Sequence, residues 1–178
     1  MELQPIRDEH ERTVAKWLSE PANYQWLHFG NGVQQLNALS LKMMLAKIHV
    51  HHLRLFTDSA GNPAGIVALS DINRVFQTAT LWYVLGDKKC AGKGYTTQAV
   101  KLMLAESFLV LELNSVYAWV VDENIASIRI LENSGFTPTG RHRMAHKIDQ
   151  RYYDVLFYDM LAHEFKPEKK EKNDVAHT

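Results

Sequence analysis

A run of glycines and lysines in the middle of the chain has the residue types of an anion-binding loop. Residues 86–99 (GDKKCAGKGYTTQA) lie between an expected strand and an expected helix. Gly92 and Gly94 let the backbone turn with free N–H groups and have no Cβ to obstruct a ligand. The helix that follows adds unpaired N-terminal amides and the positive end of its dipole, so the loop would hold a pyrophosphate. Three lysines add positive charge there: Lys88, Lys89 and Lys93.

Two common nucleotide-binding patterns are excluded at this loop. A P-loop ends in Gly-Lys followed by Ser or Thr, whereas Gly92-Lys93 is followed by Gly94. A Rossmann fingerprint needs a third glycine early in the fold, whereas Thr97 stands at that place and the loop lies mid-chain. A basic turn without a ligand remains the alternative interpretation.

Other reactive side chains point to simpler roles. Cys90 lies in the basic loop, which would lower its pKa, but no base adjoins it in the sequence, and we interpret it as incidental. Alternate histidines among His49, His51 and His52 would face one way on a strand. No carboxylate or cysteine accompanies them at ligand spacing. We therefore expect an ordinary, partly exposed strand there and no metal site.

Hydrophobic periodicity indicates which elements position these residues. Helices are expected at 9–18, 36–48, from Tyr95 onward and at 125–133, and strands at 52–56, 65–70, 78–85, 115–121 and 152–161. The helix from Tyr95 is apolar around most of its circumference, which predicts a central position. Alternation of strands and helices predicts a mixed α/β sheet. The second helix is expected to bury an apolar stripe formed by Leu39, Met43, Met44 and Ile48.

Composition limits the class of protein. A chain of 178 residues, 46% of them apolar, suits one domain, which we expect at 1–165, with a charged and disordered tail at 166–178. Lys plus Arg equals Asp plus Glu at 20 each, so no overall charge favours nucleic acid or an anionic membrane as partner. One cysteine excludes a disulfide framework and suits a reducing compartment. Without a visible signal segment or membrane span, we expect a cytoplasmic protein.

Three segments carry a family resemblance. Residues 92–99 resemble the acetyl-CoA loop of GNAT acetyltransferases, whose pattern is Arg/Gln-x-x-Gly-x-Gly/Ala. Residues 116–136 (VYAWVVDENIASIRILENSGF) resemble the family's next segment, a strand, Asn-x-x-Ser/Ala and a helix closing on Gly-Phe. Residues 151–161 (RYYDVLFYDML) resemble the terminal strand of the Rim branch, which acetylates ribosomal-protein N-termini and has relatives acting on polyamines and amino sugars. The resemblance implies a mixed central sheet of about seven strands, with a splayed central pair and helices on both faces.

The resemblance also implies acetyl-CoA as the cofactor and assigns residues to it. Exposed amides at Val84, Leu85 and Gly86 would hold the pantetheine arm. Asn124 would hydrogen-bond the cofactor arm and Ser127 would lie near the thioester sulfur, although Asn124 is also a good N-cap on its own account. Backbone groups of the loop would take the pyrophosphate: Lys89, Cys90, Ala91, Gly92, Lys93, Gly94, Tyr95 and Thr96.

Three departures from the family pattern concern cofactor binding and proton transfer. Lys89 stands where Arg or Gln is usual and Gln98 replaces a common Glu, and neither undermines cofactor binding. Leu131 occupies the place of the tyrosine that protonates the departing thiolate in many GNAT enzymes. The resemblance therefore transfers this role to Ser127.

Amine acetylation needs a neutral amine, a proton acceptor, donors for the tetrahedral oxyanion and a proton for the thiolate. The oxyanion donor is expected to be the amide of Val84 or Leu85. The general base is left open among Asp71, Tyr83, Asp154, His28 and a water relay. For Asp154 we favour a structural pairing with a nearby arginine.

Aromatic residues in the N-terminal third are expected to form the acceptor pocket, as in GNAT enzymes. Residues 17–21 (WLSEP) resemble the Trp-x-x-x-Pro opening of Rim-like and amino-sugar acetyltransferases. We therefore assign Trp26 and His28 to a pocket wall and Glu20 to attraction of a cationic amine, with core packing as the alternative.

These observations predict an acetyl-CoA-dependent N-acetyltransferase that acts by direct attack in a ternary complex. The acceptor is left open among amino sugars, polyamines and a protein N-terminus. A non-catalytic acyl-CoA-binding module is the alternative, because the family's tyrosine is missing. Zero net charge disfavours nucleic-acid binding, and the resemblance allows for a homodimer.

Overall fold

The structure is a computed structural model that describes residues 1–29, 33–47 and 49–167. Most of the expected tail, residues 168–178, lies outside the described residues. Along the described part of the chain the elements are β1 (Gln4–Pro5), α1 (Asp8–Ser19), α2 (Pro21–Tyr24), α3 (Ala38–Ala46), β2 (His52–Thr57), β3 (Pro63–Asn73), β4 (Thr78–Leu85), the 3-10 helix η1 (Lys88–Cys90), α4 (Tyr95–Leu109), β5 (Ser115–Val121), α5 (Ile125–Asn133), β6 (Thr137–Ile148) and β7 (Arg151–Leu161).

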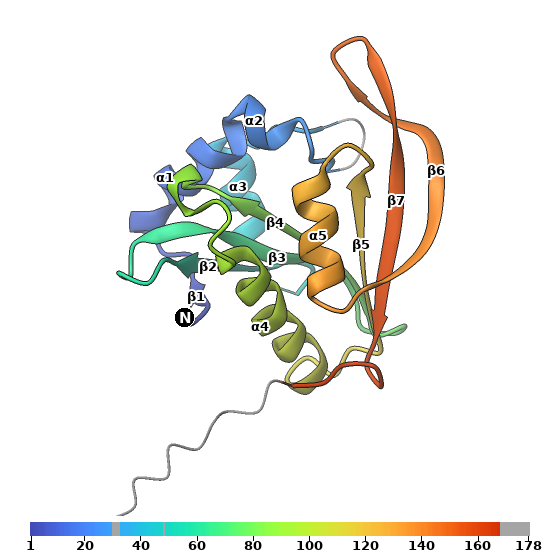
Figure 1. Cartoon of the computed structure of the whole chain (residues 1–178). Coiled ribbons are helices and arrows are strands. Elements are labelled where there is room, and N and C mark those ends of the chain that lie inside the picture. The colour runs from blue at the N-terminus through green and yellow to red at the C-terminus, as the bar shows by residue number, and fades with distance from the viewer. Residues whose placement is uncertain (30–32, 48, 168–178) are drawn as a thin grey trace, which may run out of the picture.

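The strands form one mixed sheet in the order β1-β2-β3-β4-β5-β7-β6. The central pair, β4 and β5, is parallel and is joined only at its beginning, from Thr78 opposite Ser115 to Thr80 opposite Tyr117. Beyond that point β4 stays with β3 and β5 stays with β7, so the two strands diverge (Figure 1). The predicted seven-stranded sheet with a splayed central pair is confirmed.

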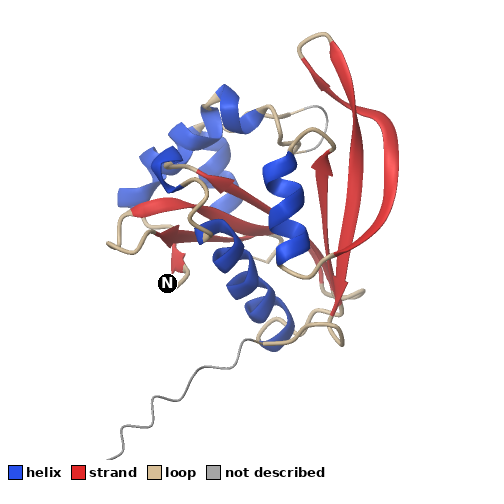
Figure 2. Ribbon diagram, in the orientation of Figure 1, coloured by secondary structure: helices blue, strands red, loops and turns tan. Residues whose placement is uncertain are grey.

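Helices cover both faces of the sheet (Figure 2). On one face, Leu18 of α1 packs with Ile66 of β3 and Val84 of β4. On the other face, Met103 of α4 packs with Val67 of β3. Successive strand residues point to opposite faces, which explains why β3 is apolar almost without interruption. The predicted central position of the helix from Tyr95 is confirmed, because α4 belongs to the larger of the two cores.

The apolar stripe predicted for α3 is wrong. Leu39 and Met43 are 68% and 56% exposed, whereas Leu41 is fully buried against α1 and β2. Met44 is half-buried, and Ile48 lies outside the described residues. The periodicity was misleading because α3 is apolar on most sides, so that tertiary packing decides which side is covered.

Besides η1, three elements were not expected from the sequence. β1 is a two-residue strand, and the four-residue helix α2 begins at Pro21, a residue suited to the first helical position. β6 (TPTGRHRMAHKI) is an edge strand in which His146 is the one buried residue. An exposed edge strand has no buried face to impose alternation, and β6 also carries Pro138 and Gly140.

An ion-pair cluster joins α4 to β2. Glu106 Oε1 lies 2.8 Å from Arg54 Nη2 and 2.9 Å from His52 Nε2. Hydrogen bonding to His52 lowers the pKa of Glu106 to about 2, against an opposing effect of burial, with Arg54 adding to the decrease. A carboxyl group whose pKa is lower in the folded protein than in the unfolded one stabilises the fold at pH values above the unfolded-state pKa. This stabilisation is lost as the pH falls through the folded-state pKa.

We expect Glu106→Gln to destabilise the protein near neutral pH by about 1 kcal/mol, a value reduced by solvent screening of the partly exposed carboxylate. The gap in melting temperature between wild type and variant should narrow as pH falls from 4.5 toward about 2. Thermal unfolding at pH 7, 5, 4 and 3 measures it. The exposed Glu2→Gln is the control and should show no gap at any pH; a Glu106 gap that stays constant with pH would contradict this account.

Candidate active site

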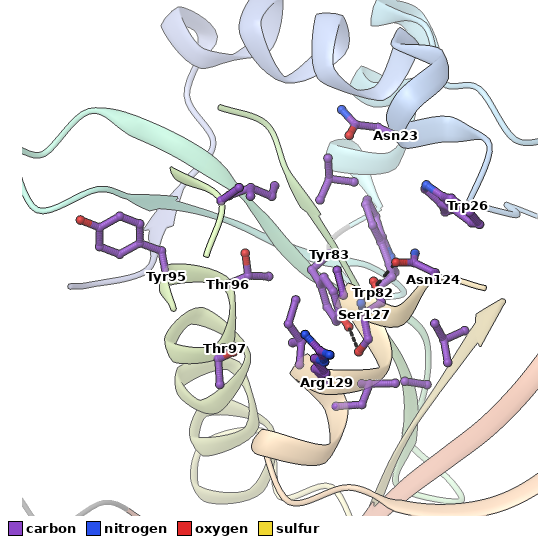
Figure 3. A pocket seen from close by; sticks show the side chains of 18 of the residues that line it. Asn23, Trp26, Trp82, Tyr83, Tyr95, Thr96, Thr97, Asn124, Ser127 and Arg129 are labelled. Atoms are coloured by element: carbon purple, nitrogen blue, oxygen red, sulfur yellow. Dashed lines mark hydrogen bonds between the residues drawn. The ribbon is translucent and has the colours of Figure 1, made fainter. Parts of the chain in front are cut away.

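A cavity of about 640 Å³ occupies the gap between the diverging ends of β4 and β5. Leu81 and Tyr83 of β4 line it from the face of α4, and Trp82 and Val84 line it from the opposite face. The cavity therefore passes through the plane of the sheet. Side chains of α2, α5 and the start of α4 complete its wall, as Figure 3 shows for Asn23, Ser127 and Thr96.

The glycine loop closes one end of this cavity. Gly92 and Gly94 have φ angles of 74° and 79°, in the left-handed region that favours glycine. The amides of Lys89, Cys90 and Ala91 are already used in turn hydrogen bonds to Asp87 and Lys88. The Lys93 N–H donates to the Cys90 carbonyl at 3.4 Å, so the loop amides left for a ligand are those of Gly92 and Gly94. They are followed by the first turn of α4, where helix geometry leaves N–H groups unpaired. This narrows the predicted range, which began at Lys89.

Side chains around the loop are held in place. The Tyr95 hydroxyl donates to Ser59 Oγ at 3.1 Å and accepts from the Ser59 N–H at 3.3 Å, which ties the start of α4 to the β2–β3 turn. Lys88 lines the cavity, whereas Lys89 and Lys93 are not among its described lining residues. Lys88 Nζ donates to the Leu85 carbonyl at 2.9 Å and also to Asn23 Oδ1. Burial lowers the pKa of Lys88, although the charge of Glu20 opposes the decrease.

Cys90 is not a reactive thiol. Its side chain is 4% exposed and belongs to the core beneath α4. Burial raises its pKa, with Asp87 acting in the same direction. The lowering expected from the basic loop is thus wrong, and the incidental role fits the structure.

The β3–β4 ladder determines which β4 amides face the gap. The Gly86 N–H donates to the Ala64 carbonyl at 2.9 Å, and in an antiparallel ladder alternate residues face the same neighbour. The Val84 amide accordingly faces β3, and those of Tyr83 and Leu85 face the gap. Of the two oxyanion donors expected from the sequence, this geometry leaves Leu85 and argues against Val84.

Ser127, Tyr83 and Asn124 lie together at the centre of the cavity (Figure 3). The Tyr83 hydroxyl donates to the Ser127 carbonyl at 3.1 Å, and burial raises the pKa of this phenol. Tyr83 therefore stays protonated and is unsuited to act as general base. The Asn124 side chain accepts from the Ser127 N–H at 3.2 Å, so it has the capping role that was the alternative for it. Leu131 is buried close by and offers no proton.

A second cavity, of about 340 Å³, lies beside the first on the face covered by α1 and α3. Trp82, Trp119 and Leu27 line both cavities, so the two meet at this point. His28 and Asp71 line the second cavity, whereas Trp26 lines the first. Trp119 packs between two imidazoles, with ring centroids 6.4 Å from His28 and 5.9 Å from His146.

Two predicted residues lie elsewhere. Glu20 is not among the described lining residues of either cavity, and its carbonyl accepts the first hydrogen bonds of α2. Asp154 lies in the β6–β7 hairpin, where Oδ2 is 3.2 Å from Arg141 Nη1 and Oδ1 accepts from the Met144 N–H at 2.9 Å. The structural pairing favoured for Asp154 is what the structure contains.

The histidine segment differs from its expected strand, because β2 begins only at His52. His49 is exposed in the preceding turn, and His51 faces the second cavity. Among the residues that the structure describes, no group of three His, Cys, Asp or Glu side chains is arranged to hold a metal ion. In the same part of the chain, no helix has the length and apolar character needed to cross a membrane.

Several lining residues were not foreseen. Trp119 had a usable signal, since Tyr117 and Trp119 alternate along β5 and must share a face. Arg129 lies within the Asn-x-x-Ser helix that the sequence marked, and its exposed side chain lines the first cavity. Asn23 had no local signal, because it reaches Lys88 only through the fold.

Comparison with known proteins identifies the family to which the chain is similar. The family model described as an acetyltransferase (GNAT) domain matches residues 1–137. The probable N-acetyltransferase YjcK of Bacillus subtilis (strain 168) is 38% identical over 111 residues, which cover 62% of this chain and 61% of that protein. The putative ribosomal N-acetyltransferase YdaF of the same strain is 28% identical over 109 residues, covering 61% and 59%. The aligned region thus spans less than two thirds of either relative.

The fold has a close counterpart among solved structures. The spermidine N-acetyltransferase from Vibrio cholerae, solved in complex with CoA and spermine, superposes with a TM-score of 0.80 over 92% of this chain and 96% of that one, at 20% identity. The YdaF match agrees with the predicted resemblance to the Rim branch. On the family match, which covers most of the chain, this protein belongs to the GNAT acetyltransferase family.

Proposed function

We propose that this protein is an acetyl-CoA-dependent N-acetyltransferase that transfers the acetyl group to a primary amine by direct attack in a ternary complex. The observation that carries the proposal is the cavity through the sheet, with the glycine loop at one end and Trp82 and Trp119 at the other. A donor in this cavity and an amine in the second would meet where the cavities join. Holding two reactants in this way replaces several kcal/mol of barrier without a covalent intermediate.

The residues of the first cavity fit acetyl-CoA. The amides of Gly92 and Gly94, the first amides of α4 and the dipole of that helix suit a diphosphate. Lys88 and Arg129 add positive charge. The free edge of β4 at Tyr83 and Leu85 suits an amide-containing pantetheine arm. When bound, acetyl-CoA supplies an activated acyl group with a thiolate as leaving group.

In this proposal three protein groups act on the reaction. The amides of Tyr83 and Leu85 donate to the oxyanion, which is stabilised most where donors are fixed in advance. The Ser127 hydroxyl provides the proton for the thiolate. Tyr83 holds the Ser127 backbone through its hydrogen bond and is a positioning residue in this mechanism.

Ser127→Ala should lower kcat about tenfold and leave CoA affinity unchanged. This decrease in kcat is small for the loss of a general acid, because the thiolate of a thiol with a pKa near 8.5 can leave with little help from protonation at neutral pH. Steady-state kinetics with calorimetric CoA binding measures both quantities. Ser107→Ala, a buried serine bonded to its own helix, is a control outside the cavity. Normal turnover of Ser127→Ala at several pH values would remove Ser127 as the acid.

Release of free thiol from acetyl-CoA, measured with a panel of primary amines, tests the function itself. Amine-dependent release supports it. CoA binding without turnover of any amine would favour the alternative, a non-catalytic acyl-CoA-binding module. We further propose a cytoplasmic location, which suits the free, buried thiol of Cys90. We also propose that the protein is a homodimer, and light scattering would test this.

A further inference from the structure

The second cavity contains a polar atom that the fold leaves without a partner. Nδ1 of His51 is buried, and no hydrogen-bond partner for it exists among the described residues. A buried polar atom in this condition costs about 1–3 kcal/mol, and such atoms deserve a functional explanation. His51 therefore needs a partner that enters the cavity from outside.

The position of His51 is fixed by its neighbours. Its N–H donates to the Lys47 carbonyl at 2.9 Å, and the adjacent Val50 carbonyl accepts from the Ile72 N–H at 3.1 Å. These bonds join the end of α3 to the end of β3. The imidazole is thus presented to the cavity by backbone that is held on both sides.

Asp71 faces the same cavity from a strained position. Its φ is 53°, in the left-handed region that a non-glycine residue seldom adopts, and it lies in the irregular register between Ser70 and Asn73. Bulges of this kind re-aim a side chain and occur next to active sites. Thr80 donates its hydroxyl to Asp71 Oδ2 at 3.5 Å. Among the described residues that line the cavity, Asp71 carries the single carboxylate.

The charges around His51 favour a neutral imidazole. Burial lowers its pKa from the ordinary value, and the charges of Lys47 and His49 act in the same direction. Asp71 opposes them by attracting a proton to the ring. Among the described residues that line the cavity, His28 and Tyr117 are the other titratable side chains. A neutral imidazole beside a carboxylate can accept a proton and have the resulting charge stabilised.

From this arrangement we infer that His51 accepts the proton of the substrate ammonium, that Asp71 binds this ammonium, and that the acceptor is a compact ring-bearing amine with one positive charge. The inference rests on the proposed function. The ring is favoured by aromatic side chains in the wall: Phe29, Trp82, Tyr117 and Trp119. A single charge is favoured because one carboxylate would leave the further charges of a polyamine unbalanced.

With this proton transfer the reaction balances in atoms and charge without a further reactant. The ammonium gives one proton to His51, and the freed lone pair forms the C–N bond at the thioester carbonyl carbon. The C–S bond breaks and Ser127 protonates the thiolate. The nitrogen loses its second proton, which restores the Ser127 hydroxyl, and His51 returns its own proton to solvent. The sum is ammonium plus acetyl-CoA giving amide, CoA thiol and one proton.

The test uses His51→Gln in the full chain, with D-glucosamine, tyramine and spermidine as probe amines and thiol release as the readout between pH 5.5 and 9.5. We expect His51→Gln to lower kcat at least tenfold and to remove the acid limb of the kcat profile, with CoA affinity unchanged. Its matched control is His49→Gln, an exposed imidazole in the turn that precedes His51, which should keep the wild-type kcat and retain the acid limb. Glucosamine or tyramine should have a higher kcat/KM than spermidine.

A second variant keeps the inference testable if His51→Gln does not fold. Asp71→Asn removes the charge that favours the imidazolium, so the acid limb should move to lower pH by about half a unit to one unit, and KM for the amine should rise. The role of His51 is overturned if the wild type is active and His51→Gln leaves both kcat and the acid limb unchanged. It is also overturned if Asp71→Asn does not shift the acid limb. Preference for spermidine overturns the substrate class. A wild type that binds CoA but acetylates none of the probes overturns the proposed function instead.

Discussion

Gly92→Asp should weaken CoA binding by about 30- to 100-fold. The left-handed φ of 74° disfavours any side chain there, at about 1 kcal/mol, and a carboxylate beside the diphosphate adds repulsion of about 1–2 kcal/mol. Each 1.4 kcal/mol corresponds to a factor of about ten in affinity. Calorimetric titration with CoA measures the change directly.

Gly92→Asn separates the two causes, because it has the shape of Asp without the charge. It should lose only about fivefold in affinity, the share that backbone strain explains. A Cβ at Gly92 meets no atom within 4 Å, so backbone strain alone should lower the melting temperature, by about 2–4 °C and equally in both variants. Equal affinity of the Asp variant and wild type for CoA would mean that the diphosphate binds elsewhere, and the assignment of this loop would fail.

Gly86→Ala should destabilise the fold by about 2–3 kcal/mol, because the new methyl group overlaps a buried ring. A Cβ at this position would stand 2.0 Å from Cδ2 and 2.2 Å from Cε2 of Trp17. Trp17 is 7% exposed and packed in the core beneath α1, so its ring has no free space to enter. For a chain of this length we expect the melting temperature to fall by about 5–10 °C.

A double-mutant cycle attributes this loss to the contact. Trp17→Leu removes the ring and costs stability itself, but adding Gly86→Ala to it should cost little more. Gly140→Ala is the matched control, because a Cβ there meets no atom within 4 Å and the melting temperature should not change. Additive losses in the cycle would show that Gly86 matters for another reason than the Trp17 ring.

Local signals predicted the parts of the site that lie on one continuous stretch of chain. Gly92, Gly94 and the start of α4 form the loop within a few residues, and their roles follow from backbone geometry that glycine permits. Asn124 and Ser127 are joined by a capping bond that the Asn-x-x-Ser spacing implies. The alternation of strands and helices likewise sufficed for the mixed sheet.

Features that arise only when distant segments meet were missed or misjudged. The contact of Asn23 with Lys88 joins residues 65 positions apart. Burial beneath α4 raises the pKa of Cys90 and outweighs the lowering effect of Lys93. His51 belongs to a turn, but its importance comes from the bulge at Asp71 on another strand. Periodicity failed for α3 and β6, where neither element has a single polar face and a single apolar face.

The short parallel seam between β4 and β5 has a mechanical consequence. Three residue pairs join β4 to β5. By contrast, β4 pairs with β3 and β5 pairs with β7 along most of their lengths, so the sheet consists of two halves. Beyond the seam, the halves are joined by apolar side chains of the α4 core, by the hydrogen bond from Tyr83 to Ser127 and by the ring contact of His28 with Trp119. A molecule bound along the opening would contact both halves of the sheet at once. We expect its thickness to influence the angle of the opening, and with it the space that remains for the acceptor where the two cavities meet.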